Sequence, residues 1–291
     1  MHPLEPLFCS LGHRTYERDG HLWINVGRFS LTTSPGGIPF VMDRWEIDEL
    51  LRESGALVAN FATALPTGIE SVAYTIKDPN YGPKSVKRQF RQHLMRGSEH
   101  CEVRELDSNE LFKQGLSVNR DTARQRNEPN APYTKSSNWA EFCDTVAQDQ
   151  TLLAIGCFVK GKLASFVIGW INDERCDGLM MHHDVAFTDY RPTHKIIHGF
   201  GRIMISRPGI SLVCIGRDSI PSQSSLAQFK RSAGFDLTPI RVAVLPHPGW
   251  GAILTNPWTR GTFRQLRQRM SGRIKGLENS EVLDVAAMTQ I

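Results

Sequence analysis

Two patterns of apolar and polar positions alternate along this chain, and both are clearest after residue 99. Two segments, 151–159 and 162–171, are apolar nearly throughout and are separated by the dipeptide Lys160-Gly161. Short apolar runs joined by a tight turn predict the two strands of a hairpin, buried on both faces. Between such runs lie segments with apolar residues at every third or fourth position, which predict amphipathic helices.

From residue 99 to 256 the predicted order is strand, helix, helix, three strands, helix, strand, helix, strand, strand. The predicted ranges are 100–106, 107–126, 138–148, 151–159, 162–171, 178–187, 192–206, 211–216, 222–232, 238–245 and 251–255. Asp107 suits an N-cap, and Pro192 stands where the first turn of a helix tolerates proline. This order predicts an α/β fold with one mixed sheet covered by helices on both faces. We expect its core to include Phe158, Phe166, Ile168, Val213 and Phe235.

Residues 1–98 carry a separate pattern, which predicts an N-terminal α+β region. A strand is expected over 21–33, a helix from Asp43 to Gly55, strands over 56–62 and 69–77, and a basic helix over 84–96. The last part, 257–291, predicts a second basic helix and a tail. The chain is thus expected to comprise regions 1–98, 99–256 and 257–291.

Composition narrows the class of protein. With 40% hydrophobic and 22% charged residues, the chain has ordinary globular composition, and its 291 residues suffice for one large or two modest cores. No uncharged apolar run predicts a membrane helix, and the first ten residues lack the layout of a secretory signal, so we expect a cytoplasmic protein. None of the six cysteines forms a CxxC pair, so we expect buried, reduced thiols. The net charge of +4 slightly favours anionic ligands.

The predicted order resembles the GNAT acyltransferase fold over residues 99–256. The segment from Ser225 to Phe235, with Phe229-Lys230 ahead of Gly234-Phe235, is most similar to Fem-like members, the peptidoglycan-bridge aminoacyltransferases and their relatives. Such proteins often carry a second, degenerate GNAT unit, and the helix–strand–strand–helix order of residues 43–97 is compatible with one. The resemblance implies an N-acyltransferase that moves an acyl group from a thioester or similar carrier to a small-molecule or peptide amine.

The resemblance also implies where acyl-CoA would bind as a co-substrate. An extended arm would pair with the predicted strand 178–187, and its phosphates would lie at the N-terminus of the following helix, where free N–H groups favour anions. The residues implied are Val185, Ala186, Phe187, Tyr190, Arg191, Thr193, His194 and Lys195. The sequence departs from the common pattern because 190–195 contains no glycine, and Phe229 stands where many members have a tyrosine acid. The donor therefore stays open between acyl-CoA, another charged carrier and none.

Three titratable residues are the catalytic candidates. His182 and Asp184 lie on the strand expected to line the cleft, and Asp218 follows the next buried strand, where ligands of parallel sheets bind. His182 or Asp218 would act as the general base for the amine, and Asp184 would orient an imidazole. A polar strand end with hydrogen-bonded histidines explains the same cluster without catalysis. Adjacent strand residues point apart, so we expect no metal site.

Two other functions remain open. Without the glycine loop and the tyrosine, the fold would serve as a non-catalytic binding module. The basic helices expected at 84–96 and 260–275 would suit an RNA-associated protein, or a tRNA that carries the acyl group, although a solvated helix face is the usual explanation of such segments.

Overall fold

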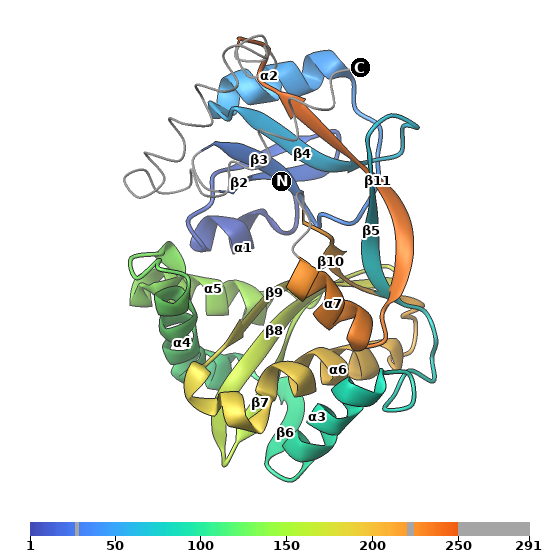
Figure 1. Ribbon diagram of the computed structural model, residues 1–291. Helices are drawn as coiled ribbons and strands as arrows, with labels where there is room; N and C mark the ends of the chain where they lie inside the picture. Colours follow the sequence, from blue (N-terminus) through green and yellow to red (C-terminus); the bar gives the residue numbers. More distant parts are fainter. Residues whose placement is uncertain (27–28, 220–223, 250–291) are drawn as a thin grey trace.

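One twisted sheet runs through the whole protein (Figure 1). The computed structural model describes residues 1–26, 29–219 and 224–249. Within these residues the sheet has eleven strands in the order β1-β2-β3-β4-β11-β5-β10-β9-β8-β7-β6. The strands are β1 Thr15–Arg18, β2 His21–Val26, β3 Ser30–Ser34, β4 Val58–Thr63, β5 Ile69–Ile76, β6 Cys101–Leu106, β7 Leu152–Val159, β8 Lys162–Asn172, β9 Arg175–His183, β10 Leu212–Arg217 and β11 Asp236–Pro246.

The sheet is mixed, as expected. β3 runs parallel to β4 and β9 runs parallel to β10, whereas every other neighbouring pair is antiparallel. β5 comes from the N-terminal region but lies between β10 and β11. The division predicted at residue 98 therefore marks a change along the chain and not a break in the sheet.

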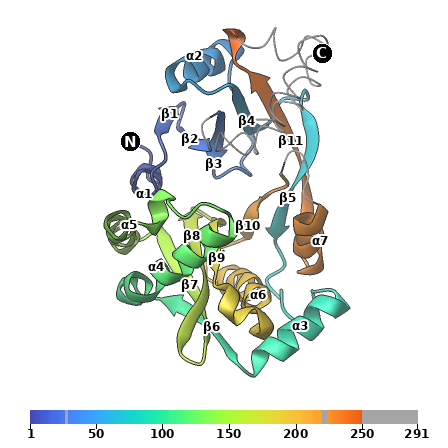
Figure 2. The ribbon, with the colours of Figure 1, turned by 60° about the vertical axis from the view of Figure 1, so that its left-hand side comes forward.

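Helices cover both faces of the part of the sheet that follows residue 99 (Figures 1 and 2). α4 and α5 pack with α1 on one face, and α3, α6 and α7 pack on the other. α2 covers β4 at the other end of the sheet. The helices are α1 Glu5–Ser10, α2 Arg44–Ser54, α3 Arg88–Ser98, α4 Ser108–Gln125, α5 Ser136–Gln148, α6 Pro192–Ile205 and α7 Ser224–Ser232, with short 3-10 helices η1 Pro132–Thr134 and η2 Val185–Tyr190.

The predicted core is confirmed. β7 is buried at every position, and β8 is buried from Leu163 to Trp170. All five expected core residues are less than 9% exposed. Because these strands are covered by helices on both sides, an apolar residue is favoured at every position and not only at alternate ones.

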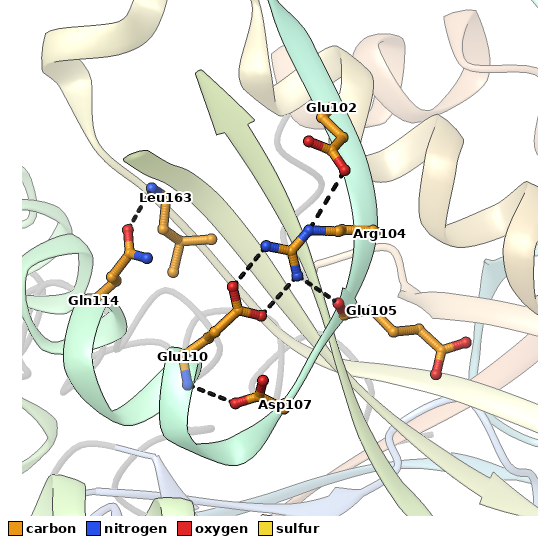
Figure 3. A network of polar contacts seen from close by, with 7 residues as sticks. All are labelled: Glu102, Arg104, Glu105, Asp107, Glu110, Gln114 and Leu163. Atoms are coloured by element: carbon orange, nitrogen blue, oxygen red, sulfur yellow. Dashed lines mark hydrogen bonds and ion pairs between the residues drawn. The ribbon is translucent and has the colours of Figure 1, made fainter. Parts of the chain in front are cut away.

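Local signals begin and end several helices where the sequence places them. Asp43 and Glu46 form a capping box at the start of α2, and Gly55 ends it with a positive φ of 67°. In Figure 3 the Asp107 side chain accepts a hydrogen bond of 2.8 Å from the Glu110 backbone N–H and so caps α4. Pro192 is the first residue of α6, as predicted.

Side chains around that cap join α4 to β6 and β8. Both guanidinium Nη atoms of Arg104 lie 2.6 Å from the carboxylate of Glu110 and point toward it in Figure 3. The Gln114 side chain accepts a hydrogen bond of 2.9 Å from the backbone N–H of Leu163. These contacts position α4 against the sheet, and bidentate geometry makes the Arg104–Glu110 pair more specific than a single ion pair.

Three local predictions were wrong, and two elements were not predicted. The strand expected over 21–33 is the hairpin of β2 and β3, and α1 and β1 were not foreseen. The basic helix expected from residue 84 begins at Arg88, because residues 83–86 form a turn whose carbonyls Arg91 binds. The strand expected over 178–187 ends at His183, since Asp184 caps η2 by accepting a hydrogen bond from the Ala186 N–H.

Some predictions fall outside the described residues. These are the strand at 251–255, the basic helix at 260–275 and the region 257–291 as a whole. In the part of the chain that the structure describes, no helix combines the length and apolar character that crossing a membrane requires.

Candidate functional site

The two parallel strands β9 and β10 part from each other at the centre of the sheet. They are paired only through residues 175–177 and 212–214. Beyond this point β9 continues beside β8, while β10 shifts register and stays with β5. No other described strand pairs with the edge of β9 from residue 178 onward. An extended group could therefore bind to this edge as a guest strand.

The free edge is shorter than the sequence suggested. The backbone N–H of His183 donates to the Thr122 hydroxyl (3.2 Å), which in turn donates to the carbonyl of His183 (2.9 Å). α4 thus closes the far end of the edge. Val185, Ala186 and Phe187 lie in η2 and not on the strand, so they have no ladder position to offer a ligand.

Lys230 of α7 lies beside the opening between the two strands. Its Nζ donates a hydrogen bond of 2.9 Å to the carbonyl of Ile215 on β10 and lies 4.6 Å from the centre of the Tyr74 ring. Burial lowers the pKa of the Lys230 ammonium. The carbonyl oxygen and the ring face both stabilise a cation at this position. No role was predicted for Lys230 from the sequence, although its spacing of three residues from Ala227 and from Ala233, both buried, was an available signal.

A pocket of about 990 Å³ opens at the end of β10. The β4–β5 connection and the ends of β5 and β11 line it, together with Asp218, Ser219 and Arg231. Asp218 is held in place by its backbone N–H, which donates to the carbonyl of Val72 (2.8 Å), and its carboxylate accepts from the Ser219 N–H (3.1 Å). Of the three catalytic candidates, Asp218 is the one that lines this pocket.

Arg217, the residue before Asp218, carries a largely buried charge. Its guanidinium donates to the side-chain oxygen of Asn60 (2.7 Å) and to the Asn60 carbonyl (3.3 Å), and lies 3.5 Å from the Thr32 hydroxyl. Burial alone lowers its pKa to about 10, with no carboxylate contributing. Arg175 differs, because Asp177 neutralises it with two hydrogen bonds of 2.6 and 2.7 Å.

His182 lies in the interior and not in an open cleft. It is 3% exposed, between the rings of Tyr133 and Phe166. Asn119 donates its amide to the Tyr133 carbonyl, which leaves its oxygen to accept from Nδ1 of His182. Burial, with smaller contributions from Arg126 and His183, lowers the pKa of His182 to about 3. The imidazole is therefore neutral at pH 7.

Asp184, the third catalytic candidate, does not contact His182 in the structure. Its carboxylate accepts a hydrogen bond of 2.9 Å from the Ala186 N–H and thereby caps η2. The sequence analysis placed Asp184 beside His182 because strand residues two apart share a face. Since β9 ends at His183, that alternation stops before Asp184.

The first turn of α6, where phosphates were expected, is covered by α3. A Cβ at Gly97 would lie 2.9 Å from the Tyr190 carbonyl and 2.9 Å from the Lys195 side chain, so α3 ends directly against this turn. Pro192 offers no N–H, and the N–H groups of His194 and Lys195 both bond to the carbonyl of Arg191. Few backbone donors therefore remain for an anion.

The side chains expected at that turn point in different directions. The imidazole of His194 packs against Phe90 and Phe229 at ring-centre distances of 4.8 and 5.1 Å, and burial lowers its pKa to about 4. The ring of Tyr190 contacts His100. Arg191 and Thr193 are partly exposed, whereas Lys195 faces a second pocket between α3 and α6. The structure therefore does not bring the predicted cofactor residues together.

Comparison with known proteins identifies the fold. No protein-family model matches the sequence, and no curated protein matches it significantly. Among solved structures, FemX matches with a TM-score of 0.52 at 11% identity, covering 86% of this chain and 93% of FemX. The chain has a GNAT/Fem-like fold.

Two further structures support this fold. The C-terminal (DUF2156) domain of a protein assigned as a lysylphosphatidylglycerol synthetase from Agrobacterium fabrum matches with a TM-score of 0.51 at 13% identity, over 82% of this chain and 86% of that domain. A conserved protein of unknown function from Bacteroides thetaiotaomicron matches with a TM-score of 0.55 at 13% identity, over 83% of this chain and 88% of that protein. The resemblance expected from the Phe229-Lys230 segment is thereby confirmed at the level of the fold.

Proposed function

We propose that this protein transfers an acyl group from an activated carrier to an amine. The observation that carries the proposal is the opening between β9 and β10, with the partly buried Lys230 on one side and Asp218 in the pocket at the end of β10. Acyl transfer requires a polarised carbonyl, a neutral amine and the alignment of the two. Lys230 would polarise the acyl carbonyl, and Asp218 would take the proton that the amine loses. The free edge of β9 would align the two reactants.

In the proposed reaction the acyl group lies along residues 178–182 and its carbonyl oxygen accepts a hydrogen bond from the Lys230 ammonium. The acceptor amine enters from the pocket and gives its proton to the Asp218 carboxylate. Its nitrogen then forms a bond to the acyl carbon, and the bond from that carbon to the carrier breaks. Phe229 has no proton to give, so the leaving group takes its proton from solvent or from the substrate.

We assign the general base to Asp218 in preference to His182. A base must reach the amine through a hydrogen bond or one water. Asp218 lines the pocket, whereas His182 is surrounded by Tyr133, Phe166 and Asn119 and is 3% exposed. We propose a supporting role for His182, which holds α4 against β9 through Asn119.

The donor we favour is an acyl ester on a carrier other than CoA. α3 covers the first turn of α6, and His194 is neutral at pH 7, so the expected phosphate site is poorly built. The name of the Agrobacterium fabrum protein, lysylphosphatidylglycerol synthetase, describes a product in which an amino acid is attached to a phospholipid. Aminoacyl esters are therefore the donors to test beside acyl-CoA.

The experiment is a transfer assay with the full chain, labelled aminoacyl-tRNA or acetyl-CoA as donor, and amine acceptors that include aminolipids and amino sugars. Lys230→Met and Asp218→Asn should each lower turnover by about 100-fold, the usual scale for losing an oxyanion donor or a general base. Lys162→Met, at an exposed position on β8, is the matched control and should keep full turnover.

Full turnover in both variants would overturn the assigned roles. Absence of transfer with every donor, while a carrier still binds, would favour the non-catalytic binding module. The covered first turn of α6 and Phe229 are the observations that keep this second function in view.

A further inference from the structure

A second pocket, of about 260 Å³, is lined mainly by residues of α3, α6 and β6. These three elements lie beside one another in Figure 1. It is on the side of α6 that faces β6, where a Cβ at Gly199 would lie 2.5 Å from the Val103 side chain. Asp218 and Lys230 do not line it. The pocket is therefore separate from the proposed acyl-transfer site.

Apart from the Cys101 thiol, the titratable lining of this pocket is basic. Arg91 comes from α3, and Lys195, His198 and Arg202 follow one another along one side of α6. Among the described residues that line the pocket, none is an aspartate or a glutamate. Three side chains with a full positive charge thus face a small volume that contains no protein carboxylate.

Arg91 is held in place before any ligand binds. Its Nε donates to the carbonyl of Pro83 (2.7 Å), and one Nη donates to the carbonyls of Lys84 (3.2 Å) and Val86 (3.1 Å). The other Nη makes no hydrogen bond to the described part of the chain. A guanidinium fixed in this way loses little side-chain entropy when an anion binds to its remaining N–H groups.

His198 adds a polar atom without a partner. The side chain is 8% exposed, and among the described residues its Nε2 has no hydrogen-bond partner. Burial, with smaller contributions from Arg202 and Lys195, lowers the pKa of His198 to about 4, although a hydrogen bond to the Gly82 backbone acts in the opposite direction. The other ring nitrogen donates to the Gly82 backbone, so in the neutral ring Nε2 is a buried acceptor without a partner, which costs stability until a ligand hydroxyl satisfies it.

We propose that this pocket binds a phosphate group through Arg91, Lys195 and Arg202, with the neutral His198 beside them. A ligand with one carboxylate would neutralise only one of the three positive charges. The pocket better suits a phosphate monoester dianion, or a phosphodiester whose chain continues along the surface. The forked geometry of guanidinium matches the oxygens of phosphate. The proposal does not depend on acyl transfer, because binding can be measured without turnover.

The phosphate could belong to a small molecule or to an RNA backbone. Lys84, Lys87, Arg88 and Arg96 are exposed on or just before α3 and lie outside the pocket lining. An RNA chain would reach these residues, whereas a small phosphate would not. Arg88 therefore distinguishes the two sources.

The test is titration of the full chain with inorganic phosphate, adenosine monophosphate and a short single-stranded RNA, followed by calorimetry. Arg202 is exposed and makes no ion pair with another described residue, so its replacement should leave the fold intact. We expect Arg202→Gln to weaken phosphate binding about tenfold and Arg202→Glu to abolish it, the scale of one charge-assisted hydrogen bond. Arg88→Gln is the matched control.

If the ligand is a small phosphate, Arg88→Gln binds it as the wild type does, and RNA binds no tighter than adenosine monophosphate. If the ligand is RNA, it binds more tightly than either small probe, both variants weaken it, and its affinity falls steeply with salt. Either result supports the pocket. Absence of binding by all three probes, or binding that Arg202→Glu leaves unchanged, would overturn the proposal.

Discussion

Burial acts in the same direction on basic side chains in different parts of this protein. It lowers the pKa of Lys230, Arg217, His182, His194 and His198, because the charged form of each loses hydration. The histidines become neutral at pH 7, whereas Arg217, with a pKa of about 10, stays charged. Lys230 keeps a carbonyl and a ring face that favour its ammonium form.

The buried histidines predict sensitivity to acid. The pKa of His182 is about 3 in the folded state and about 6.5 when unfolded, so between these values the unfolded chain binds the extra proton. Stability should therefore fall as pH decreases through this window, by up to about 1.4 kcal/mol per pH unit for each such histidine. Urea unfolding at pH 7, 6 and 5 measures it.

His182→Gln should show a shallower dependence on pH, together with a loss of about 1–3 kcal/mol at pH 7 from the disturbed bond to Asn119. His100→Gln, at an exposed position, is the control and should follow the wild type. A pH dependence of His182→Gln equal to that of the wild type would show that the buried imidazole does not titrate in this way.

At the scale of elements, α6 approaches its neighbours closely because of where its glycines and Phe200 lie. Gly199 contacts β6 and Gly201 contacts the Ile76 and Tyr81 side chains. The Phe200 ring fits against Gly169 of β8 and Gly178 of β9. α6 is thereby fixed beneath the point where β9 and β10 part.

The packing at Gly199 can be tested with a rescue. In an exposed helix, glycine to alanine usually adds about 1 kcal/mol of stability. Here the added Cβ would lie 2.5 Å from Val103, so Gly199→Ala should cost about 1–3 kcal/mol. Because Val103→Ala removes the clashing methyl groups, the double variant should be more stable than the sum of the single changes predicts, as measured by urea unfolding. Simple additivity would rule out this contact as the cause.

At the scale of the whole molecule, the N-terminal and C-terminal regions share one sheet. β11 pairs with β4 through residues 241–246 and with β5 through residues 236–242, and runs between the two ends of the molecule (Figure 2). The segment after β5 adds further contacts, since the Tyr81 hydroxyl donates to the carbonyl of Ala233 (2.6 Å). The two regions are therefore joined by paired strands and by side-chain contacts.

We therefore expect the full chain to unfold in one cooperative transition. The slowest-exchanging amides of β4 and β8 should open with the same free energy in native-state hydrogen exchange. Phe61→Ala and Phe166→Ala, each expected to cost about 3–5 kcal/mol, should lower that free energy equally at both strands. Two separate transitions, or a change confined to the mutated region, would contradict a shared folding unit.

The fold class could be predicted from this sequence because its signals are local. Asp43 with Gly55, Asp107, the Lys160-Gly161 turn and Pro192 each act within one turn of the chain. The apolar runs of β7 and β8 need only burial on both faces to be favoured. A few residues thus determine each boundary, whatever lies elsewhere in the molecule.

The site was predicted only in part, and Asp218 and His182 show why. The end of a buried strand is a position that the sequence can indicate, and Asp218 lies there beside the large pocket. The His182 side chain points into the interior because Asn119 of α4 binds its imidazole there. Asn119 lies 63 residues away in the sequence, so no local pattern indicates this contact. No role was predicted for Lys230, because its contacts with Ile215 and the Tyr74 ring form only in the tertiary structure.

From residue 99 onward the sequence by itself determined most elements of this protein and their order, because caps, turns and apolar periodicity act over a few residues; in the N-terminal region it missed α1, β1 and the division of β2 from β3. Only the tertiary structure decided that β5 lies between β10 and β11, that β9 and β10 part after residues 177 and 214, and that α3 covers the start of α6. These arrangements join residues up to about 170 positions apart, and they depend on how whole faces pack. The pKa values follow the same rule, because burial by distant elements sets the charge of each group.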